Sequence, residues 1–389
     1  MSKMKNALKG NMRQYAMIIA LFVVVVMFQI LTKGTLLMPL NISNIIQQNS
    51  YIMILACGML LCILTGGNVD LSVGSIVGFV GAISAVLMLQ MHLPTIPAIL
   101  ISLAIGLAIG CWNGFWIAYV GVPAFIATLA GQLLFRGFTM GILKGVSLAP
   151  LPNDYTFMAT SFLPDPLATD TLKPMTLIIA GIAISAFIVS EYTARRKRQS
   201  YGFEVPSMGI FLGKILVISA TVGFFAMKLA QYRGIPMALI LVAALVLLYS
   251  FIAKKTVLGR HTYAIGGNMK AAKLSGVKTK RVLFFVYANM GLLAAVAGII
   301  FTGRLNSATP KGGVGFELDA IASCFIGGAS TAGGIGTIVG AIVGSLLMGV
   351  LNNGMNILGV SIDWQQAIKG AVLLVAVGFD ILSKKKSNA

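Results

Sequence analysis

Residues 257–281 read VLGRHTYAIGGNMKAAKLSGVKTKR and separate two long apolar runs, 237–253 and 282–301. The surrounding segment, 254–281, carries eight Lys or Arg and no acidic residue. Each apolar run approaches the length that a helix needs to cross a bilayer, and cytoplasmic loops are enriched in Lys and Arg. The pattern therefore predicts two transmembrane helices joined by a basic cytoplasmic loop.

The basic loop also contains signals for a short helix of its own. Asn268 is a residue type that caps helix starts, and the sequence MKAAKLS follows it. Gly276 then occupies the position where a left-handed residue ends a helix without strain. We predict a capped helix of about two turns here. Because a simple connection would need neither cap, we interpret the helix as a docking surface for a cytoplasmic partner.

The composition places the whole chain in a membrane. Of its 389 residues, 58% are hydrophobic and only 10% are charged, whereas a soluble protein of this length carries far more surface charge. We predict one all-α polytopic transmembrane domain over residues 1–389. The net charge of +19 follows from the basic loops and predicts no binding of nucleic acid.

We expect ten to twelve hydrophobic segments, some of them re-entrant. The twelve that can be marked are 15–32, 44–65, 70–91, 95–119, 122–143, 174–192, 209–231, 234–253, 282–303, 316–331, 334–357 and 364–382. The strongest re-entrant candidate is 316–331, which is the shortest. The first segment is expected to be a retained span, because no signal-peptide cleavage site follows it.

Orientation follows from the distribution of Lys and Arg. If the N-terminus is cytoplasmic and every segment crosses, the cytoplasmic side holds twenty of these cations and the opposite side seven. Both termini and the loop 254–281 are then cytoplasmic. The loop 145–173, which contains three aspartates, is then extracytoplasmic.

Several kinds of site are missing from the sequence. The four cysteines stand in apolar segments without a CxxC pair, and the two histidines are far apart, so we predict no metal site. The stretch GIFLGK at 209–214 is one residue short of a Walker motif and lacks its hydroxyl residue. We therefore expect this chain to bind neither ATP nor another cofactor. If ATP drives it, a separate ATPase subunit docks on the loop 257–281.

Ionisable residues at membrane depth are costly and are usually functional or paired. Six are candidates: Asp70, Arg136, Glu317, Asp319, Asp363 and Lys369. The acids stand near segment ends, which argues against a proton- or sodium-coupled carrier. We expect Arg136 to pair structurally with Asp70 or Asp319.

Neutral polar side chains are scattered through the apolar segments, and such groups suit a polyhydroxyl solute better than an ion. Together with some of the acids they define a candidate translocation path: Asn68, Asp70, Ser72, Ser75, Asn113, Glu317, Asp319, Asn352 and Asn353. The alternative is that most of them form hydrogen bonds between helices.

A weak internal repeat links two regions of the chain. VGSIVG at 73–78 resembles IGTIVG at 335–340. Small residues four apart let helices approach closely, so we predict helix packing at Gly74, Gly78, Gly336, Gly340 and Gly344. Either a duplicated half or chance in a glycine-rich chain explains the similarity.

Three stretches together resemble the permease subunit of bacterial ribose/xylose/galactose-type ABC sugar importers. They are GGNVDLSVGS at 66–75, YAIGGNMKAAKLSGV at 263–277 and ELDAIASCFIGGASTAGGIGTIVGA at 317–341, and LNNGMNILGV at 351–360 extends the match. The resemblance covers most of the chain. The additional apolar segments between 174 and 234, around the basic RRKR, are similar to the xylose and multiple-monosaccharide branch.

The resemblance implies a multi-pass protein of the bacterial inner or plasma membrane. It also implies a homodimer of permeases, two ATPase subunits that bind ATP and Mg²⁺, and an extracytoplasmic sugar-binding protein. The sugar would be xylose, galactose, glucose or arabinose. The loop 254–281 would contact the ATPase, and the residues assigned to this coupling are Gly266, Gly267, Asn268, Ala271, Ala272, Leu274, Ser275 and Gly276. The chain itself would not be an enzyme.

Three other functions stay open on the sequence. A secondary carrier or channel for a small neutral solute would have no ATPase partner. A permease for branched-chain amino acids would share the architecture. A membrane-embedded enzyme would need a catalytic constellation that the sequence does not display.

Overall fold

The computed structural model describes residues 2–203 and 205–388. This part of the chain contains α-helices and short helical turns, and no β-strand. The helices are α1 (Ser2–Leu31), α2 (Pro39–Leu64), α3 (Val73–Leu89), α4 (Thr95–Phe115), α5 (Ala124–Leu143), α6 (Asn153–Thr160), α7 (Pro174–Ser200), α8 (Met208–Ala230), α9 (Met237–Lys255), α10 (Val257–Gly267), α11 (Met269–Leu274), α12 (Thr279–Leu305), α13 (Phe316–Ile326), α14 (Ile338–Ile357) and α15 (Ile362–Asn388).

Eight of the described helices are long and apolar enough to cross a membrane: α2, α4 with the turn that follows it, α5, α7, α8, α9, α12 and α14. Two shorter apolar helices, Met17–Leu31 and α3, add to them. The predicted all-α polytopic class is therefore confirmed.

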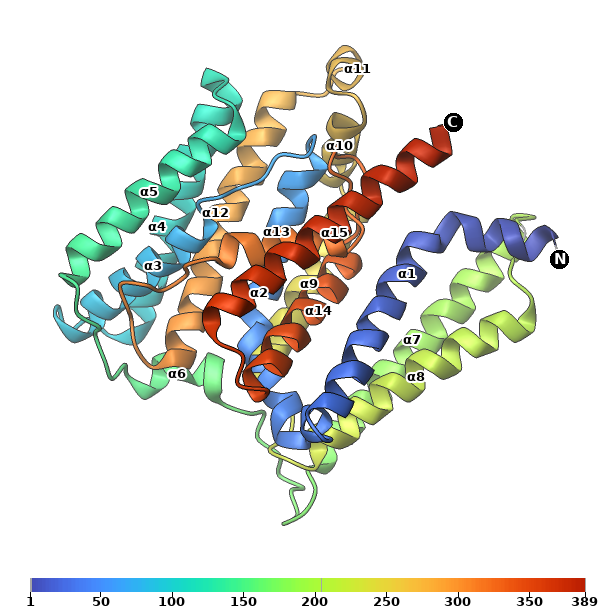
Figure 1. Cartoon of the computed structure of the whole chain (residues 1–389), viewed down its shortest axis with the longest axis horizontal. Coiled ribbons are helices and arrows are strands. Elements are labelled where there is room, and N and C mark those ends of the chain that lie inside the picture. The colour runs from blue at the N-terminus through green and yellow to red at the C-terminus, as the bar shows by residue number, and fades with distance from the viewer. Residues whose placement is uncertain (1, 204, 389) are drawn as a thin grey trace.

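The helix α12 forms the centre of the bundle and packs against α2, α3 and α4. In the most apolar window of α2, 78% of the residues are buried inside the protein, whereas the corresponding share of α7 is 6%. Figure 1 shows α7 and α8 as a hairpin beside the bundle, next to α1. The bundle therefore has an interior of central helices and an apolar hairpin that turns most of its surface outward.

The segment 316–331 forms only a partial helix. α13 has 11 residues, which corresponds to about 17 Å of helix, against roughly 30 Å for the hydrocarbon core of a bilayer. The chain then turns through the loop 327–337 into α14. The helical part of this segment is therefore shorter than a full membrane span.

The two ends of the bundle carry different elements (Figure 1). The short helices α10 and α11 lie at one end, at the top of the view, and the C-terminus points toward the same end. The short helix α6 and the loop that contains it lie at the opposite end. The two loops that the charge pattern assigned to opposite sides of the membrane, 145–173 and 254–281, are therefore at opposite ends of the fold.

Candidate functional site

The basic loop folds into two short helices, α10 and α11, which we call the foot. The Asn268 side chain accepts a hydrogen bond from the Ala271 backbone N–H over 3.0 Å and so caps α11. Gly276 adopts φ +86°, the left-handed conformation expected after the helix end. The capped helix predicted from the sequence is confirmed, and Ser275 is its C-cap residue.

The first helix of the foot, α10, is an element that sequence reasoning missed. Its start is capped by Thr256, whose hydroxyl accepts a hydrogen bond from the Gly259 backbone N–H at 3.2 Å. A threonine immediately before the apolar pair Val257–Leu258 was the available signal, because Thr is a favoured N-cap residue.

The foot exposes an apolar side chain among basic ones. Leu274 is 89% exposed, and Ala271 is exposed one turn earlier. Ala272, in contrast, is buried against the rest of the protein. The Leu274 side chain therefore contributes nothing to the core of the chain.

The foot is also tied to the interior of the bundle through α10. The Tyr263 hydroxyl donates a hydrogen bond to the Gly336 carbonyl oxygen over 2.7 Å. Burial raises the pKa of the Tyr263 phenol above its usual value, so the hydroxyl keeps its proton and stays a donor. The foot is thus linked to the loop 327–337, which joins α13 to α14.

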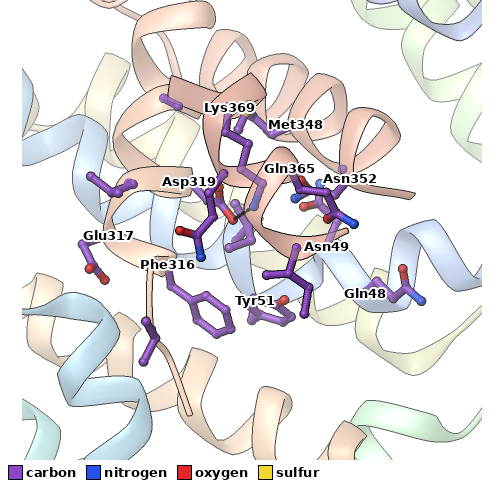
Figure 2. Close-up of a pocket in the computed structure, with 18 of the residues that line it drawn as sticks. Gln48, Asn49, Tyr51, Phe316, Glu317, Asp319, Met348, Asn352, Gln365 and Lys369 are labelled. Carbon is purple, nitrogen blue, oxygen red and sulfur yellow. Dashed lines mark hydrogen bonds and ion pairs between the residues drawn. The ribbon is translucent and has the colours of Figure 1, made fainter. Parts of the chain in front are cut away.

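A cavity of about 720 Å³ lies between α2, α13, α14 and α15. Its lining residues come from the middle of α2, the second half of α14 and the first half of α15, so it lies away from the foot, which contacts the end of α2 and the loop before α14. Figure 2 shows side chains from these helices pointing toward a common space. Amide groups dominate its polar lining: Gln48, Asn49, Asn352, Asn356, Gln365 and Gln366. The rings of Tyr51 and Phe316 stack at 4.5 Å between their centroids and form an aromatic wall. The volume falls in the range that is usual for small-molecule sites, about 300–1,000 Å³.

Charged groups in the cavity are mostly engaged with protein partners. The Lys369 ammonium pairs with the Asp319 carboxylate at 3.1 Å, as the dashed line in Figure 2 marks. Glu317 accepts a hydrogen bond from the Gln132 amide at 2.9 Å.

Some of the lining amides have protein partners too, because Asn49 donates to the Ser345 carbonyl oxygen and Gln365 donates to Asn356. Arg304 adds a further cation to the lining, so the cavity presents amide groups together with a positive charge.

The predicted path residues fall into three groups. Glu317, Asp319 and Asn352 line the cavity. Asp70, Ser72 and Asn113 instead form a buried hydrogen-bonded chain between α4 and the start of α3, in which Asn113 donates to Ser72 and Ser72 donates to Asp70.

The remaining predicted path residues have other partners. Asn353 exchanges two hydrogen bonds with Asn41, at 2.9 and 3.0 Å. Asn68 donates to Thr65 within its own loop, and Ser75 accepts a long hydrogen bond from Arg136 at 3.5 Å. The expected partners of Arg136 are thus otherwise engaged, since Asp319 pairs with Lys369 and Asp70 bonds to Ser72.

The cavity amides Gln48, Asn49, Gln365 and Gln366 were not predicted, although runs of amides at the ends of apolar segments were the available signal.

The predicted helix-packing glycines need one correction. Gly340 and Gly344 pack against the backbone around the end of α13, as expected. Gly74 allows a close approach of both the Gly313 carbonyl oxygen and the Glu317 carboxylate of α13, whereas Gly78 allows a close approach of the loop at Gly312. Gly336 precedes α14 in the loop, before the N-cap Thr337, so it is not part of a helix face and its assignment was wrong. The sequence repeat suggested a continuous helix because the loop residues there are as small and apolar as those of the helix.

No group of three or more metal-ligating side chains occurs in the described residues.

Among the comparisons with known proteins, a family model described as "Branched-chain amino acid transport system / permease component" matches residues 41–377. No solved structure matches the chain.

Several curated proteins are similar to the chain along nearly its whole length, and two of them represent the group. The xylose transport system permease protein XylH of Haemophilus influenzae is 39% identical over 386 residues, which cover 99% of this chain and 100% of that protein. The ribose import permease protein RbsC of Bacillus subtilis is 37% identical over 379 residues, 97% of this chain and 95% of that protein. With its apolar helices and its family match, the chain belongs to the family of transport-system permease components that includes the xylose and ribose permeases.

Proposed function

We propose that this chain is the membrane-spanning subunit of an ABC importer that moves a monosaccharide of the xylose, galactose, glucose or arabinose class into the cytoplasm. The observation that carries the proposal is the cavity between α2, α13, α14 and α15, whose polar lining is mainly amide groups. Amides donate and accept hydrogen bonds at once, as the hydroxyl groups of a sugar require. The full-length similarity to xylose and ribose permeases supports the same class of substrate.

The energy for transport enters through the foot in this proposal. The sequence contains no Walker motif, so ATP and Mg²⁺ are bound by a separate ATPase subunit. The exposed Leu274 and the basic residues of 254–281 support the docking of that subunit on α11. A permease of this kind contributes binding, orientation and a moving path rather than catalysis.

Two further partners complete the proposed complex. A second copy of the chain forms a homodimer, and an extracytoplasmic sugar-binding protein delivers sugar at the end of the bundle that carries α6 and the loop 145–173. Because the cavity lies away from the foot, it would receive sugar from the binding protein before the path opens on the side of the foot. Sugar selectivity would then depend on the binding protein as well as on the amides of the cavity.

The test is to purify the tagged chain from its own host, identify the subunits that accompany it, and measure uptake in proteoliposomes. We expect an ATPase subunit to copurify and ATP to drive uptake of radiolabelled xylose or a related sugar. Uptake that follows an ion gradient, with no ATPase present, would instead assign the chain to a secondary carrier. Uptake of leucine in preference to every sugar would favour the branched-chain amino acid class that the family description names.

A further inference from the structure

The foot meets the loop 327–337 at two points on one side of α10. Tyr263 donates to the Gly336 carbonyl oxygen, and Gly266 lies one turn later. Gly266 is so close to its neighbours that a methyl group there would overlap the Leu64 carbonyl oxygen and the backbone nitrogen of Gly334. α10 is therefore held against both the end of α2 and the loop, without flexible side chains between the backbones at Gly266.

The loop is itself ordered and continuous with α13. The Gly334 N–H donates to the Leu64 carbonyl oxygen at 3.1 Å, and the backbone of the loop closes on itself through a bond from Ser330 to Ile335 at 2.8 Å. Where the loop leaves α13, Gly344 of α14 packs against the carbonyl oxygen of Ser323. A displacement of the loop at Gly336 would therefore reach α13 through backbone contacts rather than be absorbed by a loose linker.

The other end of this path is the cavity. Phe316, Glu317, Leu318 and Asp319 of α13 all line it. Figure 2 shows Phe316 against Tyr51, and Asp319 directed toward Lys369 of α15. A shift of α13 would thus change both the aromatic wall and the charged pair of the cavity. Coupling between distant sites travels through such contiguous packed elements when they have two arrangements.

We propose that Tyr263 is a positioning residue for transport, because it fastens α10 to the loop 327–337 so that movement of the foot displaces α13 and reshapes the cavity. The inference rests on the proposed function and adds to it the contact through which the foot acts. Tyr263 is half-buried and does not line the cavity, and it belongs to α10 rather than to α11, on which the ATPase is proposed to dock, so its role can be separated from sugar binding and from ATPase docking.

The experiment uses the membrane complex with its ATPase subunit and a reporter on α13, Leu318→Cys. Leu318 is 54% exposed and lines the cavity, and the half-buried Cys111 is replaced by Ser so that only buried native cysteines remain. The rate of maleimide labelling is measured with and without ATP and vanadate, which trap the ATPase. We expect the nucleotide to change the labelling rate. In Tyr263→Phe, this change should fall about fivefold, the factor that corresponds to one hydrogen bond of ordinary net strength.

A matched control removes the hydroxyl group of another tyrosine that donates a hydrogen bond between two elements. Tyr249 of α9 donates to Asn289 of α12 and has no bond to the loop, so Tyr249→Phe should leave the nucleotide response unchanged. Gly266→Ala gives a second, independent variant at the same contact and should weaken the response as well. The amount of copurifying ATPase should equal that of the unmodified chain in Tyr263→Phe.

The outcomes separate this inference from the function on which it rests. A full nucleotide response in both Tyr263→Phe and Gly266→Ala overturns the inference while the importer assignment stands. Reduced ATPase copurification with Tyr263→Phe also overturns it, because the residue would then support only the folding of the foot. If the unmodified complex contains no ATPase and shows no nucleotide response, the proposed function fails and the inference fails with it.

Discussion

The Lys369 ammonium lies 3.1 Å from the Asp319 carboxylate and joins α15 to α13 across the cavity. The two side chains are 26% and 10% exposed, so both charges are largely withdrawn from water. Such a pair contributes less to the free energy of folding than the attraction between its charges suggests, because both charges lose their hydration. The loss of one partner is nevertheless strongly destabilising, because the other charge stays buried without a counterion. The ion pair therefore acts as a fastening between two helices that line the cavity.

Replacement of Lys369 by Met tests this fastening. We expect the melting temperature of the purified protein to fall and its free energy of unfolding to decrease by about 2 kcal/mol. This decrease is smaller than that for a fully buried pair, because Lys369 keeps some contact with water. The double variant Lys369→Met/Asp319→Asn removes both charges and should recover most of the loss. A single variant that melts like the unmodified chain would show that the pair does not hold the helices together.

Two neighbouring asparagines are predicted to behave differently. Asn352 lines the cavity, whereas Asn353 exchanges hydrogen bonds with the buried Asn41. Asn352→Leu should raise the KM for sugar with little effect on the melting temperature. Asn353→Leu should remove both hydrogen bonds with Asn41, which would keep only its bond to the Leu36 carbonyl oxygen. We expect this to cost about 2 kcal/mol of stability, with KM unchanged in the folded fraction. Equal effects of the two variants on KM and on melting would contradict this division.

The close approach of α13 and α14 depends on Gly344, where an added methyl group would overlap the Ser323 carbonyl oxygen. We expect Gly344→Ala to destabilise the protein by about 1–3 kcal/mol, as overpacking does. The control is Gly137→Ala in α5, where an added methyl group meets no neighbouring atom within 4 Å. Because alanine favours a helix over glycine, that control should be neutral or slightly stabilising in thermal melts. Equal melting temperatures for the two variants would rule out a packing role for Gly344.

The cap of α11 should matter for docking more than for overall stability. Asn268→Ala removes the acceptor for the Ala271 backbone N–H, which costs about 1 kcal/mol of local helix stability. If α11 must be folded to bind, the affinity for the ATPase subunit should fall about fivefold. Asn268→Asp keeps a capping side chain and should retain the affinity, as measured by titration of the ATPase onto the permease in nanodiscs. An unchanged affinity in Asn268→Ala would mean that the folded helix is not required.

The sequence was most informative where the signals are local. The cap at Asn268 and the terminating Gly276 act within a few residues, so α11 could be predicted with its bounds. The same is true of the apolar runs, whose length and composition alone indicate spans. The preceding helix α10 was missed because its glycines and basic residues resemble an irregular loop, and its packing against Leu64 and Gly334 is a tertiary contact.

The cavity could be predicted only in part, because its composition depends on helix rotation. Asn352 and Asn353 are adjacent polar residues in one apolar run, and successive residues of a helix point about 100° apart. Only one of them therefore faces the cavity, and the sequence does not indicate which. Asp70 differs in its cause, because it stands in the loop before α3, where no helical periodicity indicates its direction; it is buried and accepts hydrogen bonds from Ser72.

The most direct test of the central claim, that an ATPase subunit acts on this chain through α11, is its copurification with Leu274→Glu. Leu274 is 89% exposed and supports no core contact, so the variant should fold normally. The matched control, Leu167→Glu, changes a leucine that is 55% exposed in the loop at the opposite end. The account predicts that Leu274→Glu loses both the ATPase and ATP-driven uptake while Leu167→Glu keeps the ATPase. Full ATPase binding and normal uptake with Leu274→Glu would contradict it.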